Sequence, residues 1–167
     1  MQSDIFKYAL IKIKDSLKEI GDKSFTVVEN LSEGKNQVQV SVSDVFQCSN
    51  DKTGQRIIVG ESRYEVPAQY IMILKLTFTG KSLEDKLSIL GQVAAFFKDN
   101  NSFECGEYNW HGNESNAFFI EPVIRREANY NNKDLFLEYK IEIQVNSTKE
   151  EQFSRVKEKI LNTNQIK

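Results

Sequence analysis

The chain has 167 residues, enough for one domain with a core of ordinary size and too few for two compact domains. Its 40% hydrophobic and 28% charged residues are typical of a globular protein and argue against broad disorder. The 22 Lys and Arg and the 24 Asp and Glu give a net charge of −2, which argues against general binding to nucleic acid or to an anionic membrane.

The sequence shows no export signal and no membrane span. Its first residues lack a basic region followed by an unbroken apolar stretch, and no apolar run reaches the roughly 20 residues that cross a bilayer. Cys48 and Cys105 form no CxxC pair, so they predict two free thiols in a reducing compartment. We therefore expect a cytoplasmic protein that does not enter a membrane.

The first elements predicted are a helix and two strands. Residues 4–20 predict an amphipathic helix, because apolar side chains recur there at spacings of three and four residues: Phe6, Ala9, Leu10, Ile13, Leu17 and Ile20. From Phe25 the period changes to that of strands, which we expect over 25–28 and 38–43 with a turn at 32–36. Asp44 interrupts the apolar face of the second strand and predicts a bulge or an edge there.

The middle of the chain predicts a short strand at 57–59, a long apolar strand at 70–78 and a helix from 83 to about 98. The first half of the long strand is apolar on both faces, so we expect it to be buried on both sides. Ser82 is the predicted N-cap of the helix. Apolar side chains extend well round this helix, and we expect them to make a second contact, within the chain or with another subunit: Leu83, Leu87, Ile89, Leu90, Val93, Ala94, Phe96 and Phe97.

The last third predicts an Asn-rich acidic loop at 99–115, a strand at 117–125 interrupted by Pro122, and a regularly alternating strand at 135–145. A hairpin loop at 129–133 joins the two strands. Thr148 and Glu151 form a capping box that predicts a C-terminal helix. The expected fold class is α+β, with a mainly antiparallel sheet packed against two helices and the C-terminal helix alongside. We expect a single domain over 1–161 and a frayed tail at 162–167.

The residue types of catalysis do not assemble into a site. Glu104, Cys105, Glu107 and His111 are metal-ligand types, but their spacing matches no recognised metal site. A pair of Cys105 and His111 lacks an orienting group and an oxyanion hole, and the glycines form no nucleotide-binding motif. We therefore expect no catalytic residue, no metal, no cofactor and no enzymatic activity.

Contact with a protein partner is better supported than metal binding or catalysis. Tyr108 and Trp110 are aromatic residues on a polar loop, where they either anchor a partner or pack over the end of the sheet. The pair Arg125 and Arg126 meets a partner carboxylate or forms a solvated, internally paired surface. The candidate interface residues are Ile89, Val93, Phe96, Phe103, Tyr108, Trp110, Arg125 and Arg126.

Two consecutive segments carry a family resemblance. Residues 70–79 read YIMILKLTFT, and residues 83–101 read LEDKLSILGQVAAFFKDNN with an aliphatic-Phe-Phe-polar-Asn ending. This pattern resembles the N-terminal domain of cap, or tail-terminator, proteins of contractile phage-tail-like injection systems, with looser agreement over 6–17 and in the final strand. The stretch between Phe103 and Ala117 and the terminal helix depart from the family's pattern.

The resemblance implies a tail-terminator-like, non-enzymatic structural component of a contractile phage-tail-like or type VI-like secretion apparatus. It implies a ring of identical subunits, such as a hexamer, at the end of a tube or sheath. The implied partners are tube, sheath or baseplate proteins. The alternative function is a small-ligand binding module with a pocket between the sheet and the central helix.

Overall fold

A computed structural model describes residues 4–48, 56–59, 62–65, 68–106, 117–124, 134–145 and 150–152. These ranges contain two helices and nine strands. In chain order they are α1 (Ile5–Gly21), β1 (Thr26–Val28), β2 (Gln37–Gln47), β3 (Arg56–Val59), β4 (Ser62–Glu65), β5 (Ala68–Thr79), α2 (Leu83–Asp99), β6 (Ser102–Glu104), β7 (Ala117–Pro122), β8 (Phe136–Val145) and β9 (Glu150–Gln152).

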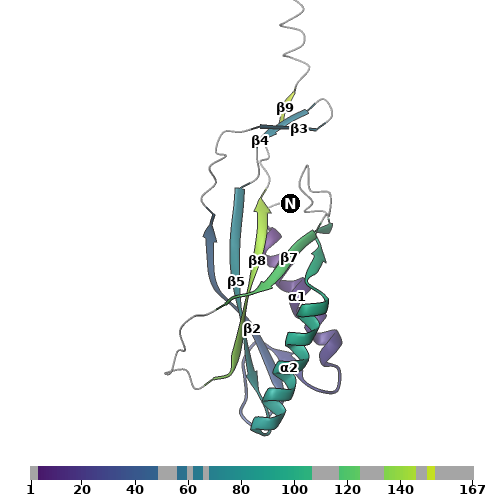
Figure 1. Cartoon of the computed structure of the whole chain (residues 1–167), viewed down its shortest axis with the longest axis vertical. Coiled ribbons are helices and arrows are strands. Elements are labelled where there is room, and N and C mark those ends of the chain that lie inside the picture. The colour runs from purple at the N-terminus through teal and green to yellow at the C-terminus, as the bar shows by residue number, and fades with distance from the viewer. Residues whose placement is uncertain are drawn as a thin grey trace, which may run out of the picture.

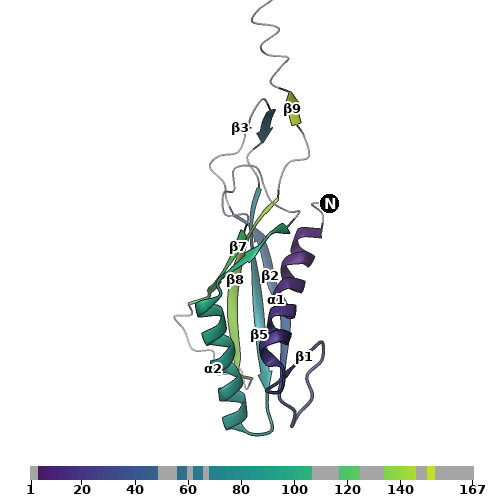
Figure 2. The same ribbon diagram turned by 90° about the vertical axis from the view of Figure 1, so that its right-hand side faces the viewer.

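Six strands form one sheet in the order β1-β2-β5-β8-β7-β6, and a small second sheet has the order β3-β4-β9 (Figure 1). Every neighbouring pair in the large sheet is antiparallel except β1 and β2, which run parallel. Both helices cover the same face of the large sheet (Figure 2). The predicted α+β class, with a mainly antiparallel sheet packed against two helices, is therefore confirmed.

The core lies between the helices and this face of the sheet. Alternation along β5 and β8 directs every second side chain toward the helices, where Leu74, Leu76 and Ile141 are fully buried. The helices contribute side chains spaced by about one turn, as expected for amphipathic helices. The buried helical residues are Ile5, Ala9, Ile13 and Leu17 of α1 and Ile89, Val93 and Phe97 of α2.

Strand β2 contains the predicted bulge and is longer than predicted. Its register with β5 shifts between Val42, opposite Leu74, and Asp44, opposite Ile73, so Ser43 is the extra residue. Beyond the bulge the side chains of β2 are exposed, yet the ladder continues to Gln47. The strand persists because β5 supplies main-chain partners along its whole length.

Two local predictions are wrong. Residues 102–104, expected within a loop, form β6 and pair with β7. Residues 150–152, expected in the first turn of a C-terminal helix, form β9 and pair with β4, which was also not predicted. In both cases a ladder with a distant strand determines the conformation. The rest of the predicted C-terminal helix and the hairpin loop at 129–133 lie outside the described residues.

Helix α2 begins as predicted at Ser82. The hydroxyl oxygen of Ser82 accepts a hydrogen bond from the backbone N–H of Asp85 at 3.1 Å, which satisfies one of the donors left free at a helix start. Gly80 precedes it in a crowded turn, because a Cβ atom at this position would lie 2.9 Å from the backbone nitrogen of Lys86. The sequence therefore determines both the turn and the first helical residue.

Replacement of the cap tests this start. Ser82→Ala is expected to lower the free energy of unfolding by about 1 kcal/mol, because the Asp85 N–H loses its acceptor. Ser88→Ala, an exposed serine in the interior of the same helix, is the matched control and is expected to change stability little or to raise it slightly. Urea unfolding measures both variants, and equal effects at the two positions would contradict the capping role.

Candidate functional site

Helix α2 carries its apolar residues on two adjacent faces. Ile89 and Val93, two of the predicted interface residues, are 3% and 0% exposed and belong to the core of the chain itself. Leu83 and Leu87 are 60% and 51% exposed, one turn apart. Of the apolar side chains expected to make a second contact, these two leucines are therefore the ones available on the surface.

Phe96 and Phe103, the next two predicted interface residues, are half-buried in a cluster of aromatic rings. The ring of Phe97 lies 5.2 Å from that of Phe96, 6.4 Å from that of Phe103 and 4.8 Å from that of Tyr139. Phe103 also stacks on Phe118 at 5.6 Å. The cluster joins the end of α2 to β6, β7 and β8, and such edge-to-face and stacked pairs add stability beyond the area that they bury.

The remaining candidate interface residues lie outside the described residues: Tyr108, Trp110, Arg125 and Arg126. The same is true of Glu107 and His111 among the metal-ligand types. In the part of the chain that the structure describes, no group of three or more His, Cys, Asp or Glu side chains is arranged to hold a metal ion.

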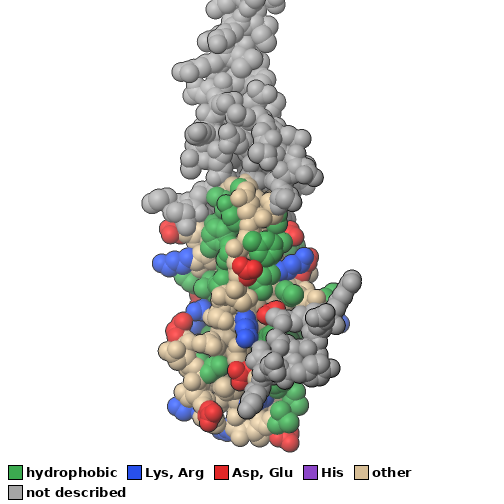
Figure 3. All heavy atoms as spheres, turned by 90° about the vertical axis from the view of Figure 1, so that its left-hand side faces the viewer, with side chains coloured by type: hydrophobic (Ala, Val, Ile, Leu, Met, Phe, Trp, Pro, Cys, Tyr) green, Lys and Arg blue, Asp and Glu red, His purple; other side chains and the backbone are tan. Residues whose placement is uncertain are grey.

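The face of the large sheet opposite the helices carries a second apolar surface. Phe46 of β2 lies opposite Ile71 of β5 and is 45% exposed, while Ile71 and Ile73 are half-buried. Phe119 of β7 is 46% exposed. Figure 3 shows hydrophobic side chains gathered toward one end of this face, with Lys, Arg, Asp and Glu side chains beside them. The expected burial of the long strand on both sides is thus complete only on the helix side.

The ladder between β7 and β8 stops partway along β8. Its last pair is Ile120 opposite Ile141, and Figure 1 shows β7 leaving β8 at an angle. Just before this point, on the outer face, Lys140 Nζ lies 3.1 Å from Glu121 Oε2. The hydrogen bond to Glu121 is the main reason that the pKa of Lys140 is raised. This pair joins the two strands where their ladder ends.

On the β7 side, the main-chain groups of β8 beyond Ile141 therefore have no partner among the described strands. The Val123 N–H donates to the Glu138 carbonyl, so the even-numbered residues of β8 direct their N–H and C=O groups toward β7. The Phe78 N–H donates to the Leu135 carbonyl, so the odd-numbered residues face β5. Among the described residues, no strand pairs with Glu142 and Gln144 on the β7 side.

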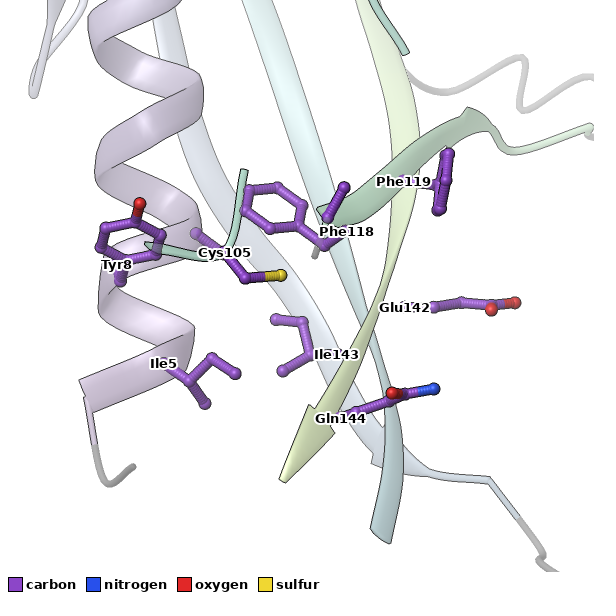
Figure 4. A pocket seen from close by; sticks show the side chains of 10 residues that line it. Ile5, Tyr8, Cys105, Phe118, Phe119, Glu142, Ile143 and Gln144 are labelled. Carbon is purple, nitrogen blue, oxygen red and sulfur yellow. The ribbon is translucent and has the colours of Figure 1, made fainter. Parts of the chain in front are cut away.

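A cavity of about 200 Å³ occupies the space where β7 and β8 separate. Figure 4 shows Ile5 and Tyr8 of α1, Cys105, Phe118 and Ile143 around it, with Glu142 and Gln144 on the other side of β8. Ala9, Ala117 and Phe119 complete its lining. Gln144 Oε1 is buried and has no hydrogen-bond partner among the described residues. The cavity borders α1, whereas the small-ligand alternative expects a pocket beside the central helix.

The wall formed by the end of β6 is held in place by α1. The Tyr8 hydroxyl donates a hydrogen bond to the Glu104 carbonyl at 3.2 Å. Cys105 follows and is buried, with its sulfur directed toward the cavity in Figure 4. Gly106 comes next with a φ of +58°, a conformation that L-residues adopt at a cost. A Cβ atom there would also lie 2.9 Å from the Tyr8 hydroxyl.

The sequence offers different signals for these features. Leu83 and Leu87 are recognisable as an i, i+4 apolar pair on the predicted helix. The separation of β7 from β8 has no local signal, because the alternation of apolar residues continues regularly through residues 135–145.

Within the described ranges, no helix is both long enough and apolar enough to cross a membrane.

The elements described above define an α+β domain in which two helices pack on one face of a mainly antiparallel sheet, and solved structures of tail terminators share this fold. The sheath/tube terminator of the PVC extracellular contractile injection system, in its extended state, matches with a TM-score of 0.56 at 12% sequence identity, over 85% of this chain and 58% of that chain. The tube terminating cap of the anti-feeding prophage matches with a TM-score of 0.57 at 14% identity, over 85% and 55% respectively.

The present chain therefore spans a little over half the length of each of these two proteins. No family model and no curated protein sequence matches it. The resemblance to cap proteins of contractile injection systems, indicated by residues 70–101, is confirmed at the level of the fold.

The wall at Gly106 gives a prediction about stability. Gly106→Ala is expected to lower the free energy of unfolding by about 1–2 kcal/mol, because the residue must keep its left-handed conformation. The new methyl group also crowds the Tyr8 hydroxyl, so Gly106→Ala is expected to lower the free energy of unfolding by less when Tyr8→Phe has removed that hydroxyl. Gly91→Ala is the control: it has open space around it in α2 and is expected to raise stability by up to about 1 kcal/mol. Urea unfolding that finds Gly106→Ala neutral would contradict the account.

The two thiols are expected to react at different rates. Burial raises the pKa of the Cys105 thiol, so less of the reactive thiolate is present at a given pH, and the side chain is only 7% exposed. Cys48 is half-buried. With iodoacetamide, Cys105→Ser protein is expected to be modified quickly and Cys48→Ser protein slowly, the latter rate still rising at alkaline pH. Mass spectrometry of the alkylated protein measures both rates, and equal rates would refute the assignment.

Proposed function

We propose that this chain is a non-enzymatic structural component of a contractile phage-tail-like or type VI-like apparatus. The observation that carries the proposal is the fold match, over 85% of the chain, to a sheath/tube terminator and to a tube terminating cap. The described residues add apolar surfaces of the kind used for assembly, on α2 and on the outer face of the sheet. We place this assembly in the cytoplasm, in keeping with the free thiols of Cys48 and Cys105.

In this proposal, identical subunits form a ring, with six as the proposed number, at the end of a tube or sheath. The exposed side chains of Leu83 and Leu87 supply the contact between subunits on one side of α2. Each of these side chains that becomes fully buried in the contact contributes roughly 1.5–3 kcal/mol to the free energy of association. The helix is already anchored by Ile89, Val93 and Phe97, so little further ordering is needed for contact.

The partners proposed for the ring are tube, sheath or baseplate proteins. The outer face of the sheet suits such a contact, because Phe46 and Phe119 are exposed there on paired strands. Exposed apolar side chains that gather on one face often mark interaction surfaces, which supports the use of this face and of the α2 face for assembly. The charged pair of Lys140 and Glu121 lies on the same outer face and provides polar contacts beside the aromatic ones.

Assembly is tested by measuring mass in solution over the micromolar range, by sedimentation velocity and by electron microscopy of negatively stained particles. The wild-type chain is expected to form closed rings, and Leu83→Glu/Leu87→Glu to remain monomeric because two carboxylates replace the apolar contact. Ser88→Glu/Ala95→Glu is the control, since it adds the same charge at two other exposed positions of α2.

Circular dichroism checks that both double variants fold, which is expected because all four positions are at the surface. A wild-type protein that stays monomeric throughout the concentration range would overturn the ring. Rings that tolerate the two glutamates at Leu83 and Leu87 would instead overturn the assignment of the contact to α2.

A further inference from the structure

We infer that the cavity between β7 and β8, together with the edge of β8 that no described strand covers, binds an extended peptide segment of another protein. The segment adds to the sheet as a strand along residues 142–144 and places one apolar side chain in the cavity. This site is separate from the α2 contact proposed for the ring and does not depend on it.

The first argument comes from the main chain. Glu142 and Gln144 direct N–H and C=O groups toward the position of a neighbouring strand, and no strand of the described part of the chain occupies it. An unpaired strand edge is a template for another strand, and main-chain hydrogen bonds supply affinity when a peptide is added in this way. Here the edge is held rigidly, because β8 pairs with β5 up to Val145 opposite Ala68.

The second argument comes from the cavity. A strand residue opposite Ile143 has its side chain on the same face as Ile143, which is the face that opens into the cavity. The walls formed by Ile5, Ala9 and Phe118 are apolar, and a cavity of about 150 Å³ with such walls accommodates a benzene ring. The 200 Å³ found here is therefore large enough for a leucine or phenylalanine side chain of the added strand.

The third argument comes from the polar groups beside the cavity. The residues of an added strand that flank the apolar one lie on the outer face, next to the Glu142 carboxylate and the Gln144 amide. Glu142 is exposed and favours a Lys or Arg there, while the buried Gln144 Oε1 needs a hydrogen-bond donor. A small apolar molecule would fill the cavity but would leave both the main-chain groups and this oxygen without partners, so a peptide fits better.

The experiment selects binders from a displayed library of random heptapeptides, using the full chain as the target, and then measures synthetic copies by fluorescence anisotropy. Selected sequences are expected to contain an apolar residue for the cavity, with a Lys or Arg at a neighbouring position for the outer face. N-methylation of alternate peptide amides, which removes donors but keeps side chains, is expected to weaken binding at least about tenfold in one of the two registers, a loss of about 1.4 kcal/mol.

Variants of the protein locate the binding. Ala117→Trp fills the cavity and is expected to abolish binding, whereas Ala95→Trp, on the exposed surface of α2, is expected to leave it unchanged. Glu142→Lys is expected to weaken the binding of basic peptides, with Glu84→Lys as its control. Hydrogen exchange of the wild-type protein is expected to show that the amides of Glu142 and Gln144 become protected when peptide is added.

Failure to enrich any peptide over the bare support would overturn the inference, as would equal binding by wild type and a folded Ala117→Trp variant. An apolar small molecule found in the cavity by native mass spectrometry would also overturn it. If Ala117→Trp does not fold, the inference is tested by peptide N-methylation and by hydrogen exchange, both of which use the wild-type chain. Peptide binding is expected to persist in Leu83→Glu/Leu87→Glu protein, so the ring and the peptide site are tested independently.

Discussion

The antiparallel ladder between β5 and β8 is the contact on which the rest of the molecule depends. Both strands lie inside the large sheet, β5 is paired on both edges, and the helices cover the face on which their apolar side chains alternate. Met72, Leu74 and Leu76 of β5 lie opposite Ile141, Tyr139 and Leu137 of β8 along this face. Each large apolar side chain buried there contributes about 1.5–3 kcal/mol, so this strand pair and the two helices stabilise one another.

Sequence periodicity predicts these central elements because their pattern is long and uninterrupted. Helix α1, the strands β5 and β8 and helix α2 all follow from it. The interruption at Asp44 likewise predicts a bulge or an edge in β2, and the structure has a bulge beside it, at Ser43. The pattern fails for two of the three-residue strands, β6 and β9, although it predicts the third, β1. Strand β6 has one apolar residue, Phe103, and β9 is Glu-Glu-Gln, so neither shows a strand pattern. Their conformation comes from pairing with distant strands, which local propensity does not contain.

The candidate surfaces were only partly predictable for a related reason. Apolar residues extend well round the circumference of α2, and the sequence does not reveal which part of that surface faces the sheet. Ile89, Val93 and Phe97 form the buried stripe, with spacings of four residues, and Leu83 and Leu87 lie on the adjacent face. A sequence reader can therefore predict that α2 has surplus apolar surface, but only packing in three dimensions assigns individual residues to core or surface.

The separation of β7 from β8 reflects competition between two ladders. The β7 residues Ala117–Phe119 pair with β6 on their other edge, and Phe118 stacks on Phe103. The Tyr8–Glu104 hydrogen bond ties β6 to α1, so this end of β7 follows the helix while β8 continues beside β5. Pro122 is compatible with the arrangement: its nitrogen faces the β6 side, beyond Ile120, whose N–H donates to Asn101. The edge of β8 that no described strand covers is thus a consequence of how β7 is anchored to β6 and β8 to β5.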